Sequence, residues 1–182
     1  MKTLVLGGAR SGKSKWAEKI AGASGKAVIY LATAQARDEE MQQRIAHHQT
    51  RRPAHWVTIE EPLDIAEVIR TTPAGACLLI DCLTLWLSNA LHQCQELHGD
   101  TEVKAQAWQA LKNNLLLAIR NCQCDLIIVS NETGLGVVPL GELTRQFVDE
   151  AGWLHQALGE LTDNVGFCVA GFMQILKGKN PI

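Results

Sequence analysis

Residues 7–14 read Gly-Gly-Ala-Arg-Ser-Gly-Lys-Ser, which matches the phosphate-loop pattern G-x-x-x-x-G-K-[ST] at every fixed position. Gly7 and Gly12 allow backbone angles and a close approach to phosphate that larger side chains would prevent. Lys13 can reach the β- and γ-phosphates, and the Ser14 hydroxyl can coordinate Mg²⁺. We therefore predict a nucleotide site, with Lys13 as a catalytic residue. The predicted contacts in this loop are Gly7, Gly8, Ala9, Arg10, Ser11, Gly12, Lys13 and Ser14.

Asp81 ends the apolar run Leu78-Leu79-Ile80, which has the composition of a buried strand. In phosphate-loop enzymes a carboxylate at the end of a neighbouring strand usually helps to hold the metal ion. We therefore predict Asp81 and Ser14 as metal ligands. Asp81 can alternatively cap the helix expected from Leu83, and the two roles are compatible.

Two adjacent histidines, His47 and His48, lie in a stretch with helical spacing. His48 shares one face of that helix with Ile45, whereas His47 lies about 100° away around the axis. A neutral imidazole is a competent nucleophile that can carry a covalent intermediate, and the guanidinium groups of Arg51 and Arg52 can hold a phosphate. The alternative is that these basic side chains only complement the C-terminal end of the helix dipole. From the residues alone, both interpretations stay open.

A polar stretch containing glycine follows the apolar run Leu126–Val129. Open α/β sheets place their ligands at the carboxyl ends of the strands, so Asn131 and Glu132 are candidates for polar contacts there. Gly134 and Gly136 indicate a flexible loop. A purely structural turn is the alternative.

Apolar, β-branched runs alternate with helical patterns along the chain, which predicts an open α/β sheet, mainly parallel and flanked by helices, with right-handed crossovers. The expected strands are Lys2–Leu6, Ala27–Ala32, His55–Ile59, Ala76–Asp81, Asp125–Ser130 and Val165–Ala170, with Met173–Leu176 as a short edge strand. The expected helices are Ser14–Ala21, Asp38–His48, Pro62–Arg70, Leu83–Leu91, Glu102–Asn121 and Leu140–Leu161. Because neither repeats nor a linker are visible, residues 1–182 are expected to form a single domain.

The net charge of −2 gives no argument for a nucleic-acid or membrane partner. No apolar run reaches the roughly 18–20 residues of a membrane span, and no targeting segment is visible, so we expect no membrane insertion and a cytoplasmic location. The six cysteines are then expected to be reduced thiols. His92, Cys94 and His98 form a candidate metal cluster, but a solvated loop is the favoured interpretation.

These motifs occur together, and in the same order, in one enzyme family. The chain closely resembles the bifunctional adenosylcobinamide kinase/adenosylcobinamide-phosphate guanylyltransferases of cobalamin biosynthesis, and the resemblance spans nearly its whole length. It rests on GGARSGKS at residues 7–14, the strand end Ala32-Thr33-Ala34, Asp38-Glu39-Glu40-Met41, Arg44-Ile45, His47-His48, Arg52-Pro53-Ala54-His55-Trp56, Asp81-Cys82-Leu83-Thr84, and Asn131-Glu132 through Gly136 to Pro139.

The resemblance implies a RecA-like P-loop fold, a homotrimer and two activities. The first activity phosphorylates the aminopropanol hydroxyl of adenosylcobinamide with GTP or ATP, with Mg²⁺ as cofactor. The second transfers GMP from GTP to that phosphate, giving adenosylcobinamide-GDP and pyrophosphate. The family carries the guanylyl group on a histidine of the His-His pair, which the match places at His48, with His47 as the nearest competitor. The further nucleotide contacts that the resemblance implies are Ala32, Thr33, Ala34, Gln49, Thr50, Arg51, Arg52, Glu60 and Asp81.

Two other functions compete with this one. A monofunctional P-loop small-molecule kinase would use its histidines only as helix caps and would form no covalent nucleotide. A RecA-like regulatory or assembly module would favour basic nucleic-acid-binding loops or an exposed interaction stripe, and neither stands out in the sequence. The residues that contact the corrinoid leave no spacing signature, and the sequence does not separate GTP from ATP as the donor in the kinase step.

Overall fold

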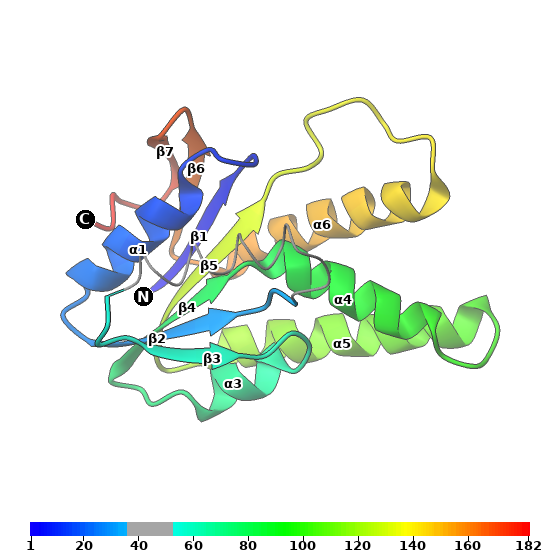
Figure 1. Ribbon diagram of the computed structural model, residues 1–182, viewed down its shortest axis with the longest axis horizontal. Helices are drawn as coiled ribbons and strands as arrows, with labels where there is room; N and C mark the ends of the chain where they lie inside the picture. Colours follow the sequence, from blue (N-terminus) through cyan, green and yellow to red (C-terminus); the bar gives the residue numbers. More distant parts are fainter. Residues whose placement is uncertain (36–52) are drawn as a thin grey trace.

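The computed structural model describes residues 1–35 and 53–182. This part of the chain is built on one seven-stranded sheet with helices on both faces (Figure 1). The strands are β1 (Lys2–Gly7), β2 (Ala27–Ala32), β3 (Val57–Glu60), β4 (Ala76–Asp81), β5 (Asp125–Asn131), β6 (Asn164–Val169) and β7 (Phe172–Lys177). Their order is β3-β2-β4-β5-β1-β6-β7, and within the described residues only the pairing of β6 with β7 is antiparallel. The expected mainly parallel sheet with a short edge strand near the C-terminus is confirmed, and the structure shows that this edge strand is antiparallel.

Successive residues of the central strands enter two different cores. In β1, Leu4 and Leu6 pack with residues from the helices α3, α4, α5 and α6, whereas Val5 packs with Ala17 and Ile20 of α1. Successive side chains of a strand point to opposite faces, so a strand covered on both faces must be apolar at every position. Burying each such aliphatic side chain contributes about 1.5–3 kcal/mol. This is why the expected bounds of β2 and β4 coincide with the observed ones.

The helices in the described residues are α1 (Lys13–Ala23), α3 (Ile65–Thr71), α4 (Leu83–Gln95), α5 (Thr101–Asn121) and α6 (Glu142–Leu161). The expected start of α3 at Pro62 is wrong. Asp64 occupies the N-cap of α3 and its carboxylate accepts a hydrogen bond from the Glu67 N–H at 3.2 Å, so side-chain capping fixes the helix start at Ile65, three residues later. The helix expected over Asp38–His48 lies outside the described residues.

Two further expectations need correction. The strand expected from His55 begins at Val57, because the backbone N–H of Trp56 closes a turn onto the Pro53 carbonyl instead of joining the ladder. The solvated loop expected around Cys94 is a continuation of α4, and the Cys94 side chain lies in the core between α4 and its neighbours. His92 is exposed on the same helix and pairs with Glu96, so the two side chains do not converge on a metal site.

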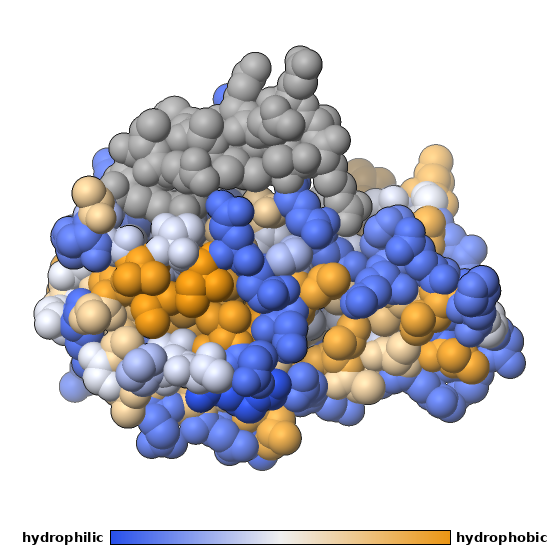
Figure 2. Space-filling model, turned by 60° about the horizontal axis from the view of Figure 1, so that its bottom comes forward, coloured by the Kyte–Doolittle hydropathy of each residue, from blue (hydrophilic) through white to orange (hydrophobic). Residues whose placement is uncertain are grey.

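The surface is mixed in character. Figure 2 shows hydrophilic side chains over most of the visible face, with one larger apolar patch and several smaller ones between them. None of the helices in the described residues has the length and apolar content needed to cross a bilayer. All six cysteines lie in the described part of the chain and are free thiols.

Candidate active site

The phosphate loop connects β1 to α1 in a tightly folded conformation. Gly12 precedes the helix with φ 98°, in the left-handed region that glycine adopts without strain. At Gly7 a Cβ would lie 2.5 Å from Ser11 Oγ and 2.6 Å from the Cys168 carbonyl oxygen, so a side chain does not fit. The two glycines that the motif fixes are therefore required by the backbone of this loop.

A turn at the sheet edge supports the loop from outside. The backbone N–H of Gly171, between β6 and β7, donates to the Ser11 carbonyl at 2.9 Å. The Trp16 indole N–H donates to the Gly171 carbonyl at 2.8 Å. A Cβ at Gly12 would lie 3.1 Å from Gly171 Cα, so the loop and this turn pack backbone against backbone. These contacts hold the loop in shape from its outer side.

Lys13 and Ser14 begin the first turn of α1, where the helix N-terminus attracts anions. The Lys13 ammonium group folds back and donates to the Gly8 carbonyl at 3.2 Å. A single hydrogen bond to a carbonyl is readily exchanged for a phosphate oxygen. The Ser14 side chain is only partly buried at the open side of the loop. These positions are compatible with the predicted roles of Lys13 as a catalytic residue and of Ser14 as a metal ligand.

Asp81 ends β4, which is separated from β1 by a single strand, β5. Its Oδ2 accepts a hydrogen bond from the Tyr30 hydroxyl at 2.8 Å, which orients the carboxylate. The N-cap of α4 is Cys82, so the alternative role of Asp81 as the cap of that helix is not the one observed. A carboxylate and a hydroxyl are hard oxygen donors, and Mg²⁺ is commonly held by one or two such groups together with phosphates. Ser14 and Asp81 fit that requirement.

Thr33 joins the end of β2 to the start of α4. Its hydroxyl donates to the Cys82 carbonyl at 2.7 Å and accepts from the Cys82 N–H at 3.0 Å, while the Asn89 amide donates to the Thr33 carbonyl at 3.1 Å. The side chain is fully buried, so any nucleotide contact from it would use the backbone. Ala34 is partly exposed beside it. Sequence reasoning missed Asn89, whose only signal is an amide on a helix face that is otherwise apolar.

We expect Thr33→Val to destabilise the fold by about 1–3 kcal/mol, since it leaves the buried Cys82 N–H without its hydrogen-bond partner. Urea unfolding of the two proteins measures this difference. Thr58→Val on the exposed face of β3 is the matched control, with an expected change below about 0.5 kcal/mol. Equal stability of the Thr33 and Thr58 variants would show that the hydrogen bonds at Cys82 contribute nothing.

Glu60 lies at the far edge of the sheet. It ends β3 opposite Ala32 of β2, and β2, β4 and β5 separate it from β1. The structure therefore brings Glu60 next to the segment 32–34 and not next to the phosphate loop. A nucleotide contact from both places requires a ligand that extends along the carboxyl edge of the sheet.

Comparison with known proteins agrees with this arrangement over the full chain. A sequence model of the family described as cobinamide kinase / cobinamide phosphate guanyltransferase matches residues 3–176. The chain belongs to this family. The bifunctional adenosylcobalamin biosynthesis protein CobP of Pseudomonas aeruginosa is 55% identical over 182 residues, which cover 98% of this chain and 99% of that protein. The bifunctional adenosylcobalamin biosynthesis protein CobU of Escherichia coli is 36% identical over 94% of this chain and 97% of its own length.

One solved structure shares the overall arrangement of this family member. A Pyrococcus horikoshii protein superposes with a TM-score of 0.52 at 10% identity, covering 97% of this chain and 86% of that chain, which shows a shared fold alone. A RadB recombinase aligns with a TM-score of 0.45 at 18% identity over 91% of this chain and 73% of its own. With the phosphate loop after β1 and the mainly parallel sheet, the predicted fold class is confirmed.

Several predicted site residues of this cobinamide kinase/guanyltransferase family member lie outside the described residues. They are His47, His48, Gln49, Thr50, Arg51 and Arg52. Their roles stay predictions from the sequence. The described residues nearest to them in the chain are Gln35, which follows the Thr33-Ala34 strand end, and Pro53.

Sequence reasoning also missed a buried polar cluster beneath the end of β5. Ser130 Oγ lies 2.7 Å from His155 Nε2 and 3.1 Å from Thr84 Oγ1. Thr84 Oγ1 accepts a hydrogen bond from the Asn131 N–H at 2.6 Å. The cluster therefore joins α4, β5 and α6. Hydroxyl residues at the end of an apolar strand are a signal for such a cluster, but nothing local indicates that His155 reaches it.

The segment after β5 is attached to the phosphate loop at its start. The Glu132 N–H donates to the Gly7 carbonyl at 3.1 Å, and Glu132 Oε1 accepts from the Gly134 N–H at 2.6 Å. Figure 1 shows that the chain then arches away from the sheet before α6. Large apolar side chains in and just after this arch are more than two-thirds exposed, namely Leu135, Val137, Val138, Leu140 and Leu143. The candidates Asn131 and Glu132 thus lie at the edge of the site, and the arch itself is open.

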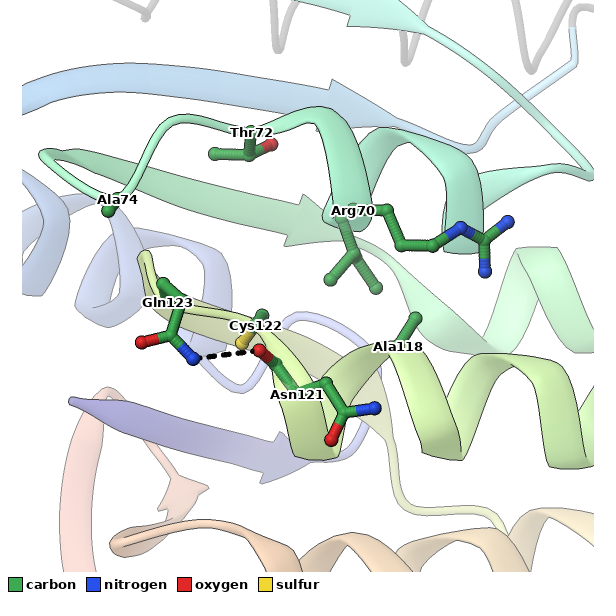
Figure 3. Close-up of a pocket in the computed structure, with 8 residues that line it drawn as sticks. Arg70, Thr72, Ala74, Ala118, Asn121, Cys122 and Gln123 are labelled. Atoms are coloured by element: carbon green, nitrogen blue, oxygen red, sulfur yellow. Dashed lines mark hydrogen bonds between the residues drawn. The ribbon is translucent and has the colours of Figure 1, made fainter.

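A shallow pocket lies at the opposite end of the sheet, before β4 and β5 (Figure 3). Arg70, Thr72 and Asn121 line it together with Cys122, whose thiol is half-buried. The pocket is remote from the phosphate loop, because β1 and β4 present their amino ends there. A hydrogen bond from Cys124 lowers the pKa of Cys122 to about 7, while burial raises the pKa of Cys77 and Cys82 to about 11.

We expect Cys122 to be alkylated before the other five cysteines by substoichiometric iodoacetamide at pH 7.5. The thiolate is the reacting form, so the rate should fall to roughly a tenth of its plateau at pH 6, one unit below the pKa. Peptide mass spectrometry identifies the labelled residue, and Cys122→Ser should remove the fast phase. First labelling at a different cysteine would contradict this assignment.

Proposed function

We propose that this chain catalyses both reactions of its family: phosphorylation of adenosylcobinamide by GTP or ATP, and transfer of GMP from GTP to the resulting phosphate through a guanylyl group on His48. The observation that carries the proposal is a complete phosphate loop, folded between β1 and α1, in a chain that matches a bifunctional relative over 98% of its length. Products of the two steps are adenosylcobinamide phosphate and then adenosylcobinamide-GDP with pyrophosphate.

In the kinase step, the loop's N–H groups and the N-terminus of α1 hold the β- and γ-phosphates. The Lys13 ammonium leaves the Gly8 carbonyl for the phosphates and offsets the charge that moves to the leaving group. Mg²⁺, bound by Ser14 and Asp81, would further neutralise the phosphate oxygens. Tyr30 keeps the Asp81 carboxylate oriented for that task.

In the second step, an imidazole nitrogen of His48 attacks the α-phosphorus of GTP and pyrophosphate leaves. The phosphate of the corrinoid then attacks the same phosphorus and the histidine is released. Arg51 and Arg52 follow the histidine closely in the sequence and can hold phosphate oxygens during both transfers. Each transfer proceeds without a change in the number of bonds at phosphorus.

The proposed nucleotide contacts extend from residues 7–14 through Ala32, Thr33 and Ala34 to Glu60 and Asp81. The register that places Ala32 beside both Asp81 and Glu60 supports a single continuous site along the carboxyl edge. Gln49–Arg52 would complete it. The single domain, the homotrimer and the cytoplasmic location stay predictions from the sequence and the family.

A product assay tests the proposal. The protein is incubated with Mg²⁺ and adenosylcobinamide, with GTP in one series and ATP in the other, and the corrinoids are separated and weighed by mass spectrometry. Both series should contain adenosylcobinamide phosphate, whereas adenosylcobinamide-GDP should form only with GTP. An unmodified corrinoid in both series would refute the proposed function.

A further inference from the structure

A partly open carboxylate stands at the edge of the sheet beside the phosphate loop. Glu132 is the first residue after β5, and β5 lies between β4, which ends at Asp81, and β1, which leads into the loop. Its backbone N–H donates to the Gly7 carbonyl, and its side chain is 22% exposed. Glu132 is therefore placed between the predicted metal ligand and the phosphate cradle.

The groups around His155 favour one tautomer of its ring. The Glu132 carboxylate beside Nδ1 can only accept a hydrogen bond, so the proton of the neutral ring belongs on Nδ1. Nε2 then accepts from the Ser130 hydroxyl, which lies 2.7 Å away. Ser130 Oγ in turn lies 3.1 Å from Thr84 Oγ1, which accepts from the Asn131 N–H.

His155 Nδ1 lies 3.6 Å from Glu132 Oε2 and has no hydrogen-bond partner within the described residues. Burial lowers the pKa of His155, while Glu132 opposes that change, so the ring is neutral near pH 7. At 3.6 Å the contact is longer than a hydrogen bond, and a shift of a few tenths of an ångström closes it. The other carboxylate oxygen is bound to the Gly134 N–H. The Gly134 N–H thus orients Glu132 from the protein side, and the Nδ1–H of His155 is placed to do so once this gap closes.

We propose that Glu132 accepts the proton of the attacking hydroxyl group in the kinase step and that His155 is the positioning residue for its carboxylate. The inference rests on the proposed kinase activity. As the hydroxyl oxygen forms its bond to the γ-phosphorus, its proton passes to a carboxylate oxygen of Glu132. The bond from the γ-phosphorus to the β,γ-bridging oxygen breaks, and the nucleoside diphosphate leaves with that electron pair. Proton acceptance of this kind contributes about 10²–10⁴-fold to a rate.

The other described carboxylates at this edge are placed less well for the task. Asp81 accepts from the Tyr30 hydroxyl and fits the metal. Glu60 is at the far side of the sheet, three strands from β1. Glu132 combines partial exposure with a direct backbone tie to the first glycine of the loop.

The test uses Glu132→Gln, whose amide oxygen can still accept from the Gly134 N–H. We expect the kinase kcat to fall by about 10²–10⁴-fold while the Kd for GTP, measured by calorimetry, changes less than about threefold. Glu132→Asp should lower the kinase kcat less than Glu132→Gln does, since a carboxylate remains, although on a shorter side chain. Glu160→Gln, at an exposed position of α6 far from the loop, is the matched control and should keep wild-type turnover.

His155 is tested with a pair of amides. Asn places an N–H near the position of Nδ1, facing Glu132, whereas Gln places its amide near Nε2, facing Ser130. We expect His155→Asn to keep about tenfold more kinase kcat than His155→Gln, with similar KM for GTP and similar Tm. A merely structural role would lower the Tm of both variants without separating their kcat values.

The outcomes separate the two proposals. If wild-type protein fails to phosphorylate adenosylcobinamide, the proposed function is refuted, and the assignment of Glu132 with it. If the wild type is active and Glu132→Gln retains its kcat, only the role of Glu132 is overturned. Equal kcat for the two His155 amides would overturn the positioning role of His155.

Discussion

Lys13→Ala should lower the kinase kcat/KM by about 10³-fold with either GTP or ATP as donor. Its ammonium folds back onto the loop and donates a hydrogen bond to the Gly8 carbonyl. Removing a preorganised charge from a transferring phosphoryl group typically costs between about 10² and 10⁵ in rate. Steady-state rates of adenosylcobinamide phosphate formation measure the loss.

Lys15→Ala is the matched control for this variant, because Lys15 lies on the same helix but is exposed. Its kinase activity should stay within about twofold of wild type, since surface charges away from a site have small effects. Retention of wild-type turnover by Lys13→Ala would contradict the assigned role of Lys13 and the phosphate-cradle reading of residues 7–14.

His48→Ala should abolish the covalent guanylyl-protein and lower GMP transfer by at least about 10⁴-fold, since loss of a covalent nucleophile has effects of this order or larger. Some kinase activity should remain, because phosphoryl transfer needs no covalent protein intermediate. The assay incubates the protein with GTP labelled at the α-phosphate and follows protein-bound label. A phosphorus–nitrogen bond predicts an adduct that is labile in acid and stable in base.

Two neighbouring substitutions control this experiment. His55→Ala removes an exposed imidazole after the predicted nucleotide-binding stretch and should leave the adduct intact. His47→Ala tests the adjacent competitor. Label that persists in His48→Ala and disappears in His47→Ala would move the nucleophile by one residue. No label in the wild-type protein would favour a monofunctional kinase.

The parts of the fold that could be predicted are the segments whose structure is determined by their own residues. β4 is apolar from Ala76 to Ile80 because both faces are covered, and the polar Asp81 ends it, so its limits could be found from composition. Pro62 predicts a helix start because proline favours a first turn, but the Asp64 side chain supplies the cap that decides the start of α3. The polar residues around Cys94 predict a loop, because they hide a helix face that packs inward.

The candidate site divides in the same way. The phosphate loop is one contiguous motif, so its residues could be predicted individually, and Asp81 is recognisable at a strand end. The hydrogen-bond partners within and around the site could not be predicted from the sequence. Tyr30 and Thr33 form hydrogen bonds to Asp81 and Cys82, about fifty residues further along the chain. His155 reaches Ser130 from a helix that begins beyond the open arch. Such contacts depend on strand order, which no local pattern encodes.

The central claim is that one chain carries out both transfers. Its most direct test is to mix the protein with Mg²⁺, GTP and adenosylcobinamide and to determine the mass of the corrinoid product. The proposed function predicts adenosylcobinamide-GDP, together with one pyrophosphate for each molecule formed. Accumulation of adenosylcobinamide phosphate as the final product, with excess GTP still present, would contradict it.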